Sequence, residues 1–327
     1  GSKETIPVGN KNVEGFYLDD SQLHFTNEKA YVIYGYAGVP SGKTAIFDAG
    51  ARVYFHANSG LIVGNNASLQ INGSKSSTSQ LENEVVFQGD RLQSDYDNVP
   101  GQWETVWLNE GATNNNVNHL TIKNASIGLL IQNNNGNNVS IKNTQIYNST
   151  HYGILAQNAY INGENIVINY AGLASLSCVY GGNYKFTHCT FNNNWSGTNK
   201  FAVRIDNYIE GAIPETQPLT ANFTNSIIFG SNTSALLINK AESANLFNYS
   251  FTKCQIKLST SENVMNNPLY AFMTDATNII QNKTPDFINA NRNNLRIGQN
   301  SHAKGFGTNS GGFDILDQPR NSPSDLG

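Results

Sequence analysis

The densest group of side chains able to do chemistry lies in one loop-like segment, QGDRLQSDYDNVPGQW. Its polar and aromatic members are Asp90, Arg91, Asp95, Tyr96, Asp97 and Trp103. Carboxylates in this pattern could hold Ca²⁺ through oxygen ligation, with Asp90, Asp95 and Asp97 as the ligands. The same segment could bind a sugar, with Trp103 offering an aromatic face. A salt-bridged loop anchored by Trp103 explains the same residues, because Asp-x-Asp alone is a weak calcium signal.

A long insertion between two repeated strands supplies the second candidate binding element. It spans residues 192–222 and contains Tyr208. Insertions in solenoid proteins emerge as loops on one face, which is often the binding face. We therefore expect the recognition site to lie along a groove bordered by this insertion and by the Asp90–Trp103 loop.

Side chains for cleaving a polysaccharide are scarce in the middle of the chain. Between Gly111 and Lys200 the only carboxylate is Glu164. Hydrolysis of a sugar bond needs carboxylates flanking that bond, and a calcium-dependent elimination needs several clustered carboxylates. The three cysteines are too few and too scattered for a metal–thiolate site. We expect no metal or cofactor apart from the calcium alternative. The residues favour a protein without catalytic activity but leave an enzyme as an open alternative.

Composition narrows the class of protein further. Hydrophobic residues make up 39% of the 327 residues, charged residues 13%, and the formal net charge is −4. A nucleic-acid binder would carry a basic surplus or stripe, so the sequence argues against a nucleic-acid partner. No apolar run reaches the roughly 18 residues needed to cross a bilayer. Abundant Gly, Asn, Ser and Thr favour many short strands joined by tight turns.

These strands belong to an internal repeat. Six rows share a small or apolar first residue, a turn-forming residue two positions later and an apolar residue five positions after the first. They read IKNASI, IKNTQI, GENIVI, FTHCTF, FTNSII and FTKCQI, and start 19, 22, 23, 37 and 28 residues apart. A period a little above twenty residues indicates a solenoid of stacked coils. Chance alignment is one alternative, and a leucine-rich repeat is another, although no row offers its L-x-x-L-x-L pattern.

The position two after each row start is Asn in most rows. It is occupied by Asn124, Asn143, Asn165, His188 and Asn225, and by Lys253 in the last row. A sharp bend between two strands needs a left-handed backbone, which Asn tolerates better than most residues. Its amide can also bond to the same position one coil above and below, as in stacked Asn ladders. We therefore predict a structural ladder along one edge, with His188 replacing Asn.

Together these features predict an all-β chain, a single-stranded right-handed parallel β-helix with three strands per coil. Each row contributes two strands, and strand-like segments such as GLLIQ, YGILAQ and FAVRI follow the rows as the third. We expect one domain over residues 1–327. Within it, residues 1–29 form a lead-in, residues 30–282 form the coils and residues 283–327 form a C-terminal cap.

Two stretches near the ends of the chain carry a distinctive pattern. The first is VPSGKTAIFDAGARVYFHANSGLIVGNNASLQING, and the second is PDFINANRNNLRIGQNSHAKGFG followed by DILDQPRNSPSDLG. They resemble the opening and the closing segment of right-handed parallel β-helix proteins of the pectate-lyase-like superfamily. The matching positions of the closing segment are Asp286, Phe287, Leu295, Ser301, Ala303, Gly305, Asp314, Arg320, Asp325 and Gly327.

Within that superfamily the chain looks close to secreted β-helix proteins of Bacteroidetes, many of them lipoproteins of unknown function. The resemblance implies an extracellular or cell-surface location, in the periplasm or at the outer membrane. It also implies that any membrane contact runs through a lipid anchor outside this sequence. The resemblance covers nearly the whole chain and is specific for architecture, not for a reaction.

The sequence therefore favours a binding or scaffold protein, expected to be a monomer. A polysaccharide or cell-surface glycan is the expected partner, because stacked sheets give a rigid rod with exposed Tyr and Asn. The candidate contacts are those of the Asp90–Trp103 loop together with Tyr208. An atypical carbohydrate-active enzyme, a polysaccharide lyase or a glycoside hydrolase, is the first alternative. An adhesin-like structural spacer is the second.

Overall fold

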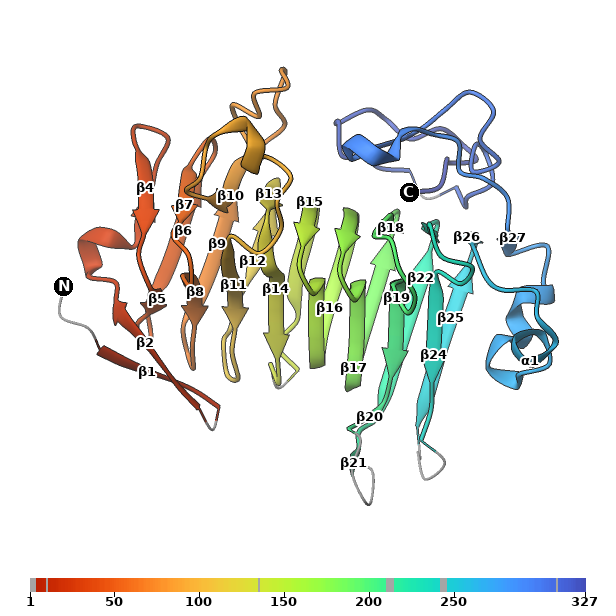
Figure 1. Ribbon diagram of the computed structural model, residues 1–327, viewed down its shortest axis with the longest axis horizontal. Helices are drawn as coiled ribbons and strands as arrows, with labels where there is room; N and C mark the ends of the chain where they lie inside the picture. The colour runs from red at the N-terminus through yellow and green to blue at the C-terminus, as the bar shows by residue number, and fades with distance from the viewer. Residues whose placement is uncertain (1–3, 10, 135, 210–214, 242–245, 310) are drawn as a thin grey trace.

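The computed structural model describes residues 4–9, 11–134, 136–209, 215–241, 246–309 and 311–327. Over these residues the chain forms a parallel β-solenoid of about 11 turns, and only 6% of the structure is helical. The strands stack along the long axis of the molecule (Figure 1) and nearly all pair in parallel. This confirms the predicted all-β parallel β-helix.

Each coil contributes one strand to each of three parallel sheets. The first sheet contains β4 (Ala30–Ile33), β7 (Arg52–Phe55), β10 (Val85–Gly89), β13 (Leu120–Lys123), β18 (Thr190–Asn193), β23 (Ile227–Gly230), β26 (Cys254–Ile256) and β27 (Ile279–Gln281). The second contains β2 (Lys11–Tyr17), β5 (Tyr36–Val39), β8 (Gly60–Val63), β11 (Trp103–Leu108), β14 (Ala125–Gln132), β19 (Phe201–Asp206) and β24 (Leu236–Asn239). The third contains β3 (His24–Phe25), β6 (Thr44–Asp48), β9 (Ser68–Asn72), β12 (Asn116–Asn118), β22 (Leu219–Thr224) and β25 (Phe247–Thr252). The long strands β15 (Val139–Ser149), β16 (Tyr152–Ala171) and β17 (Ala174–Thr187) continue around corners and join successive sheets.

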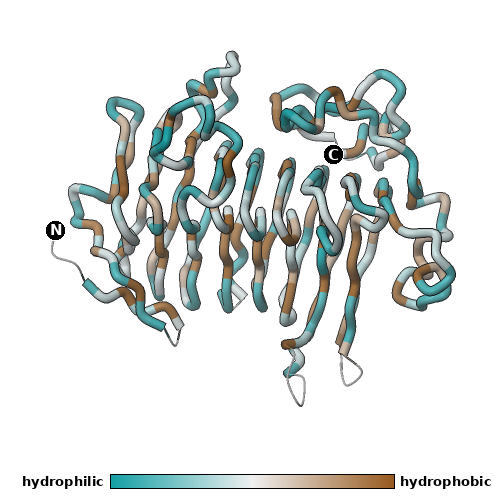
Figure 2. Tube along the Cα trace, in the orientation of Figure 1, coloured by the Kyte–Doolittle hydropathy of each residue, from teal (hydrophilic) through white to brown (hydrophobic). Residues whose placement is uncertain are grey.

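The core lies between the three sheets and is built from side chains that point inward in every coil. In the first sheet the inward column includes Phe87, Ile122, Ile146 and Ile168, which align in register and are fully buried. Because side chains alternate along a strand, their neighbours point outward. Burying each such side chain stabilises the fold by roughly 1.5–3 kcal/mol. In Figure 2 hydrophobic stretches recur coil after coil, as stacked columns require.

The corner between the third and first sheets carries the predicted ladder. Asn143, Asn165, His188 and Asn225 have φ values of 48°, 53°, 53° and 52°, as a left-handed bend requires. Asn165 Nδ2 donates to Asn143 Oδ1 at 2.8 Å, and Asn225 Nδ2 lies 3.1 Å from His188 Nε2. The register of Glu164 with Thr187 places these two bonded pairs one after the other at the same corner. The ladder corner is thus confirmed for the four residues, with His188 in the place of Asn.

Asn124 is an exception, and the prediction is wrong for this residue. Strand β13 pairs with the later half of β15, where Lys123 aligns with Tyr147 and Asn124 therefore with Asn148. Asn148 Nδ2 donates to Asn124 Oδ1 at 3.2 Å, so the two residues pair at the next corner. His119, with a φ of 50°, occupies the ladder corner in this coil. The row IKNASI was misaligned because both corners place an apolar residue two positions before a left-handed Asn.

The two ends of the solenoid are covered by different structures. At the N-terminal end β1 (Glu4–Val8) pairs antiparallel with β2, and a 3-10 helix, Asp20–Gln22, precedes β3. The first coil thus begins inside the segment predicted as a lead-in. At the other end α1 (Glu262–Met265) and a 3-10 helix, Pro268–Thr274, lie beside the last coils (Figure 1). Among the described residues, no helix combines the length and apolar character needed to traverse a bilayer.

The C-terminal segment, residues 283–327, covers a flank of the solenoid. It contains β28 (Phe287–Asn289), a 3-10 helix (Ala290–Arg292) and β29 (Asn294–Ile297), and β28 pairs antiparallel with β29. Figure 1 shows this segment (blue) folded back along the upper edge of the coils. Ala303 and Leu326 form a buried cluster with Ile227 of the first sheet. The segment therefore covers part of the outer face of that sheet, whereas α1 and the adjoining 3-10 helix cover the end of the solenoid.

Candidate functional site

The Asp90–Trp103 loop leaves the first sheet after β10 and is held by contacts within the protein. Asp90 Oδ2 lies 2.7 Å from His56 Nδ1. The guanidinium of Arg91 lies over the ring of Tyr96, 5.0 Å from the ring centroid. Tyr96 is the last residue of a short 3-10 helix, Ser94–Tyr96. These pairings match the structural interpretation of the loop, in which its charged residues bind one another and their neighbours.

The predicted calcium ligands are not gathered around one point. Among the described residues, no three His, Cys, Asp or Glu side chains are grouped as a metal site requires. Asp95 and Asp97 are exposed, whereas Asp90 is engaged by His56. Calcium binding by these three carboxylates stays a prediction.

Trp103 lies in the core and does not offer a stacking face. Its side chain is 1% exposed, and its ring stacks on Phe55 with the centroids 4.2 Å apart. Its Nε1 donates to the Lys123 carbonyl at 2.8 Å. As the first residue of β11, Trp103 anchors the end of the loop, which is the structural role that the sequence left open.

Tyr208 and the Asp90–Trp103 loop lie at opposite edges of the solenoid, so the expected common groove does not form. β20 (Tyr208–Ile209) pairs antiparallel with β21 (Glu215–Thr216). Figure 1 shows these strands below the coils and the loop before β11 above them. Within the predicted insertion, residues 201–206 form β19 of the second sheet, and β20 follows that strand. The Asp90–Trp103 loop follows β10 of the first sheet, so the two elements emerge at different corners.

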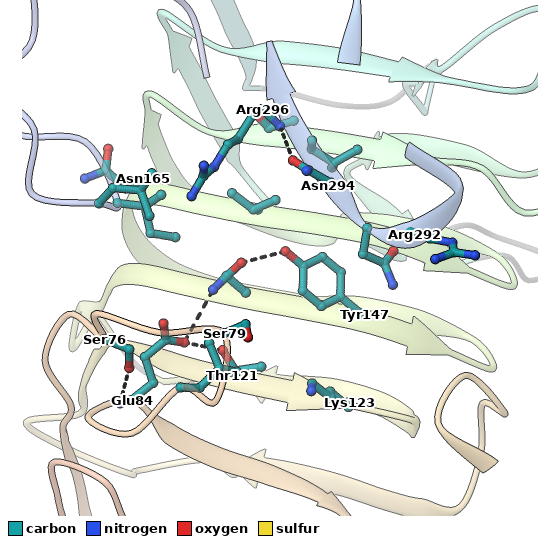
Figure 3. Close-up of a pocket in the computed structure, with 18 of the residues that line it drawn as sticks. Ser76, Ser79, Glu84, Thr121, Lys123, Tyr147, Asn165, Arg292, Asn294 and Arg296 are labelled. Carbon is teal, nitrogen blue, oxygen red and sulfur yellow. Dashed lines mark hydrogen bonds between the residues drawn. The ribbon is translucent and has the colours of Figure 1, made fainter. Parts of the chain in front are cut away.

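The structure instead forms a groove of about 1080 Å³ on the outer face of the first sheet. One wall is made by residues 76–81 and 91–98, and the other by the C-terminal segment. The floor consists of outward-facing side chains of successive coils: Glu84, Gln88, Thr121, Lys123, Gln145, Tyr147, Val167 and Thr190. Of the predicted contacts, Arg91 and Asp97 line this groove. Figure 3 shows the floor between the Ser76–Ser79 loop and β29.

A hydrogen-bond network runs across the floor. Thr121 Oγ1 donates to Glu84 Oε2 at 2.5 Å, and Gln145 Nε2 lies 3.3 Å from the same oxygen. Tyr147 donates its hydroxyl proton to Gln145 Oε1 at 2.7 Å, and Figure 3 shows these links as dashed lines. Burial raises the pKa of Glu84, and its hydrogen bonds to Thr121 and Gln145 oppose that rise. The network fixes the floor side chains across three coils.

Burial also shifts the pKa values of two further ionisable groups on the floor, Lys123 and Tyr147. Burial lowers the pKa of Lys123, while the nearby carboxylates of Asp97 and Glu84 oppose that change. Burial raises the pKa of Tyr147, so its phenol stays protonated and acts as a donor. Lys123 therefore lies between carboxylates of the wall and of the floor, and the local charges partly balance.

The second wall is tied directly to the coils. Asn169 Nδ2 donates to the Ala290 carbonyl and to Asn293 Oδ1, both at 2.8 Å. Arg320 Nη2 donates to Asn165 Oδ1 at 2.7 Å, which joins the C-terminal segment to the Asn ladder. These bonds hold β29 and its neighbours over the floor, so the groove is preformed.

The groove residues escaped the sequence analysis for different reasons. Gln145 lies between inward-facing Thr144 and Ile146, so the repeat itself places it on the outer face. Glu84 precedes β10 in a coil that no clear row covers. Arg296, on the opposite wall, comes from a segment far along the chain, and no local pattern shows which face that segment covers.

No protein-family model matches the chain, and no curated protein or solved structure matches it. The parallel β-solenoid is established by the strand pairing itself. The kinship suggested by the terminal segments remains an expectation.

Proposed function

We propose that this protein binds an extended carbohydrate in the groove over the first sheet. The single observation that carries the proposal is the groove itself, which is preformed, open to solvent and lined by outward-facing side chains of successive coils and by the C-terminal segment. Concave sites with a few fixed polar groups are the usual places where proteins bind ligands.

The chemistry of the lining suits a polyhydroxylated ligand. Hydroxyl and amide side chains line both the floor and the walls: Ser76, Ser77, Thr78, Ser79, Thr121, Asn124, Gln145, Asn293 and Asn294. Such groups both donate and accept hydrogen bonds, as the hydroxyls of a sugar do. Arg296 adds a charged donor, and Figure 3 shows its side chain reaching from β29 toward the floor.

The arrangement of carboxylates favours binding over cleavage. Glu84 is the carboxylate of the floor, and its Oε2 accepts bonds from Thr121 and Gln145. In the C-terminal wall, Asp314 Oδ1 accepts from the backbone of its own turn, and Asp325 Oδ1 accepts from the Gly305 N–H. Hydrolysis needs two carboxyl groups flanking the sugar bond. Each of these three carboxylates has an oxygen committed to structural bonds, and the fourth carboxylate of the lining, Asp97, is exposed on the wall opposite Asp314 and Asp325.

The wider setting is part of the same proposal. On the resemblance to secreted β-helix proteins of Bacteroidetes, we place the protein at the cell exterior or the cell surface, as a monomer that meets glycans there. A structural spacer remains the competing role, because a stacked rod can separate two partners without binding sugar.

A glycan array probed with the purified protein tests the proposal, followed by calorimetry with the polysaccharide that binds best. Arg296→Ala should weaken that binding roughly tenfold, because a hydrogen bond from a charged donor is worth about 1.5–3 kcal/mol. Lys185→Ala is the matched control, because Lys185 is an exposed cation on the third sheet. An array without a bound glycan, or equal effects of the two substitutions, would overturn the proposal.

A further inference from the structure

A second cavity, of about 210 Å³, lies on the outer face of the second sheet. Its base is formed by outward-facing residues of three successive coils, in which Leu155 pairs with Ser177 and Ser177 with Arg204. Tyr208 of the β20–β21 hairpin forms part of its rim. The cavity is thus separate from the groove, which lies over the first sheet.

A fixed ion pair forms the polar side of this cavity. Arg204 Nε and Nη2 lie 2.8 and 2.7 Å from Asp206 Oδ2. The Asp206 side chain is 1% exposed, whereas that of Arg204 is 36% exposed. Asp206 Oδ1 also accepts a bond from the Tyr180 backbone N–H at 3.3 Å. The buried carboxylate therefore orients the guanidinium, whose remaining N–H groups stay available at the cavity.

Ser177 supplies an independent sign that the cavity receives a polar group. It is fully buried and lines the cavity. Within the described part of the chain, its hydroxyl oxygen has no hydrogen-bond partner. Buried polar groups are nearly always paired, so an unpaired one at a cavity marks a place for an external partner.

Three half-buried tyrosines, Tyr152, Tyr180 and Tyr208, supply the aromatic side. The Tyr180 hydroxyl donates to Glu215 Oε2 at 3.1 Å, which ties the hairpin to β17. Partly exposed tyrosine rings present an apolar face beside a polar tip. The cavity thus combines flat apolar surfaces with fixed hydrogen-bond donors.

We propose that this cavity binds a single neutral pyranose ring. At about 30 Å³ per water molecule, its volume equals that of roughly seven waters, which suits one sugar ring. The ring's C–H face would pack on tyrosine, while its hydroxyls accept from Arg204 and exchange bonds with Ser177. The Arg204–Asp206 pair carries no net charge, so a neutral ligand leaves its balance intact. This site goes beyond the groove proposal and does not depend on it.

Saturation-transfer NMR with methyl glycosides of neutral pyranoses tests the site in the full chain, with dissociation constants expected in the millimolar range. Tyr208→Ala should weaken binding roughly two- to tenfold through the lost aromatic contact. Ser177→Ala should have an effect of similar size through one lost hydrogen bond. Unchanged thermal unfolding of both variants would show that neither loss comes from misfolding.

The groove variant Arg296→Ala is the control and should leave glycoside binding unchanged. If no methyl glycoside gives a signal, or if Tyr208→Ala and Ser177→Ala both bind like the parent protein, the proposal is wrong. Binding of inorganic phosphate without any glycoside signal would likewise overturn the assignment to a neutral sugar. Because Tyr208 is far from the groove, failure here leaves the array result standing, and the reverse also holds.

Discussion

Two stretches of the first sheet share the same inward face and differ on the outer one. Upstream, Thr121 and Gln145 face the open groove. Downstream, the same outward column continues with Ile227, which is fully buried under the C-terminal segment. The inward residues beside them, such as Ile146 and Ile228, are apolar and fully buried in both stretches.

This difference shows that the two faces of a solenoid strand have separate tasks. Inward side chains hold the coils together, so the column that includes Ile146 and Ile228 stays apolar in both stretches. Outward side chains are free to vary, and their polarity decides what lies on top. Polar outward side chains leave a groove open to water. Ile227, Phe229 and Ile280 instead form an apolar surface, which the C-terminal segment covers.

The largest loss of stability is expected for a substitution in the stretch of the first sheet that the C-terminal segment covers. Ile227→Ala should lower the free energy of unfolding by about 2–5 kcal/mol, because it removes methylene groups from a buried cluster. Val167→Ala, at the equivalent outward position of the open stretch, should cost less than about 1 kcal/mol. Urea unfolding measures both, and limited proteolysis reports release of residues 283–327. Equal costs at the two positions would remove the distinction between the stretches.

A pH series probes the corner beneath the C-terminal segment. Burial and the neighbouring charge of Arg320 lower the pKa of His188 from 6.5 to about 4, so the folded ring stays neutral. The unfolded state then binds more protons between these values, and stability present above pH 6.5 is lost as the pH falls toward 4. The loss at His188 amounts to about 3 kcal/mol.

His188→Asn isolates this contribution. Asn occupies the same corner at Asn165 and Asn225 and does not titrate. The variant should therefore lose less stability than the parent protein between pH 7 and pH 4 in urea unfolding. Identical pH dependence of the two proteins would show that the ring does not carry the effect.

The smallest change in stability is expected for Glu84 in the open stretch, and its pH dependence has the opposite sign to that of His188. Burial raises the pKa of Glu84, so the folded state favours its protonated form. Stability linked to Glu84 is present at acidic pH and declines as the pH rises through the folded pKa. Glu84→Gln should therefore stabilise the protein slightly at pH 7 and have little effect at pH 4. A destabilised variant at pH 7 would contradict this reading.

The repeat allowed most of the architecture to be predicted, and its failure at Asn124 is instructive. The rows around Asn143 and Asn165 predicted the position of one corner correctly, because the apolar spacing and the left-handed Asn recur together there. The same local signature occurs at the corner of Asn124 and Asn148, so composition alone did not identify which corner a row belongs to. The register of β13 against β15 resolved the ambiguity.

The candidate site was less predictable, because its parts meet only after folding. Trp103 fits an exposed platform or a core anchor equally well from its sequence neighbours, and the stacked Phe55 beneath it decided for the core. Tyr208 and the Asp90–Trp103 loop were paired as neighbours, although they leave the coil at different corners. Their directions depend on where each strand ends in the coil, which short patterns do not report.

By itself, the sequence determined that the chain coils into stacked parallel strands, because inward apolar residues and left-handed corner residues are set by spacing of a few positions. Only the tertiary structure decided where the outer face stays open. That choice depends on the C-terminal segment, which folds back over Ile227 and accepts a hydrogen bond from Asn169. The bond from Asn169 to Ala290 joins positions more than a hundred residues apart in the sequence. Such long-range docking depends on matching surfaces, which no local pattern encodes.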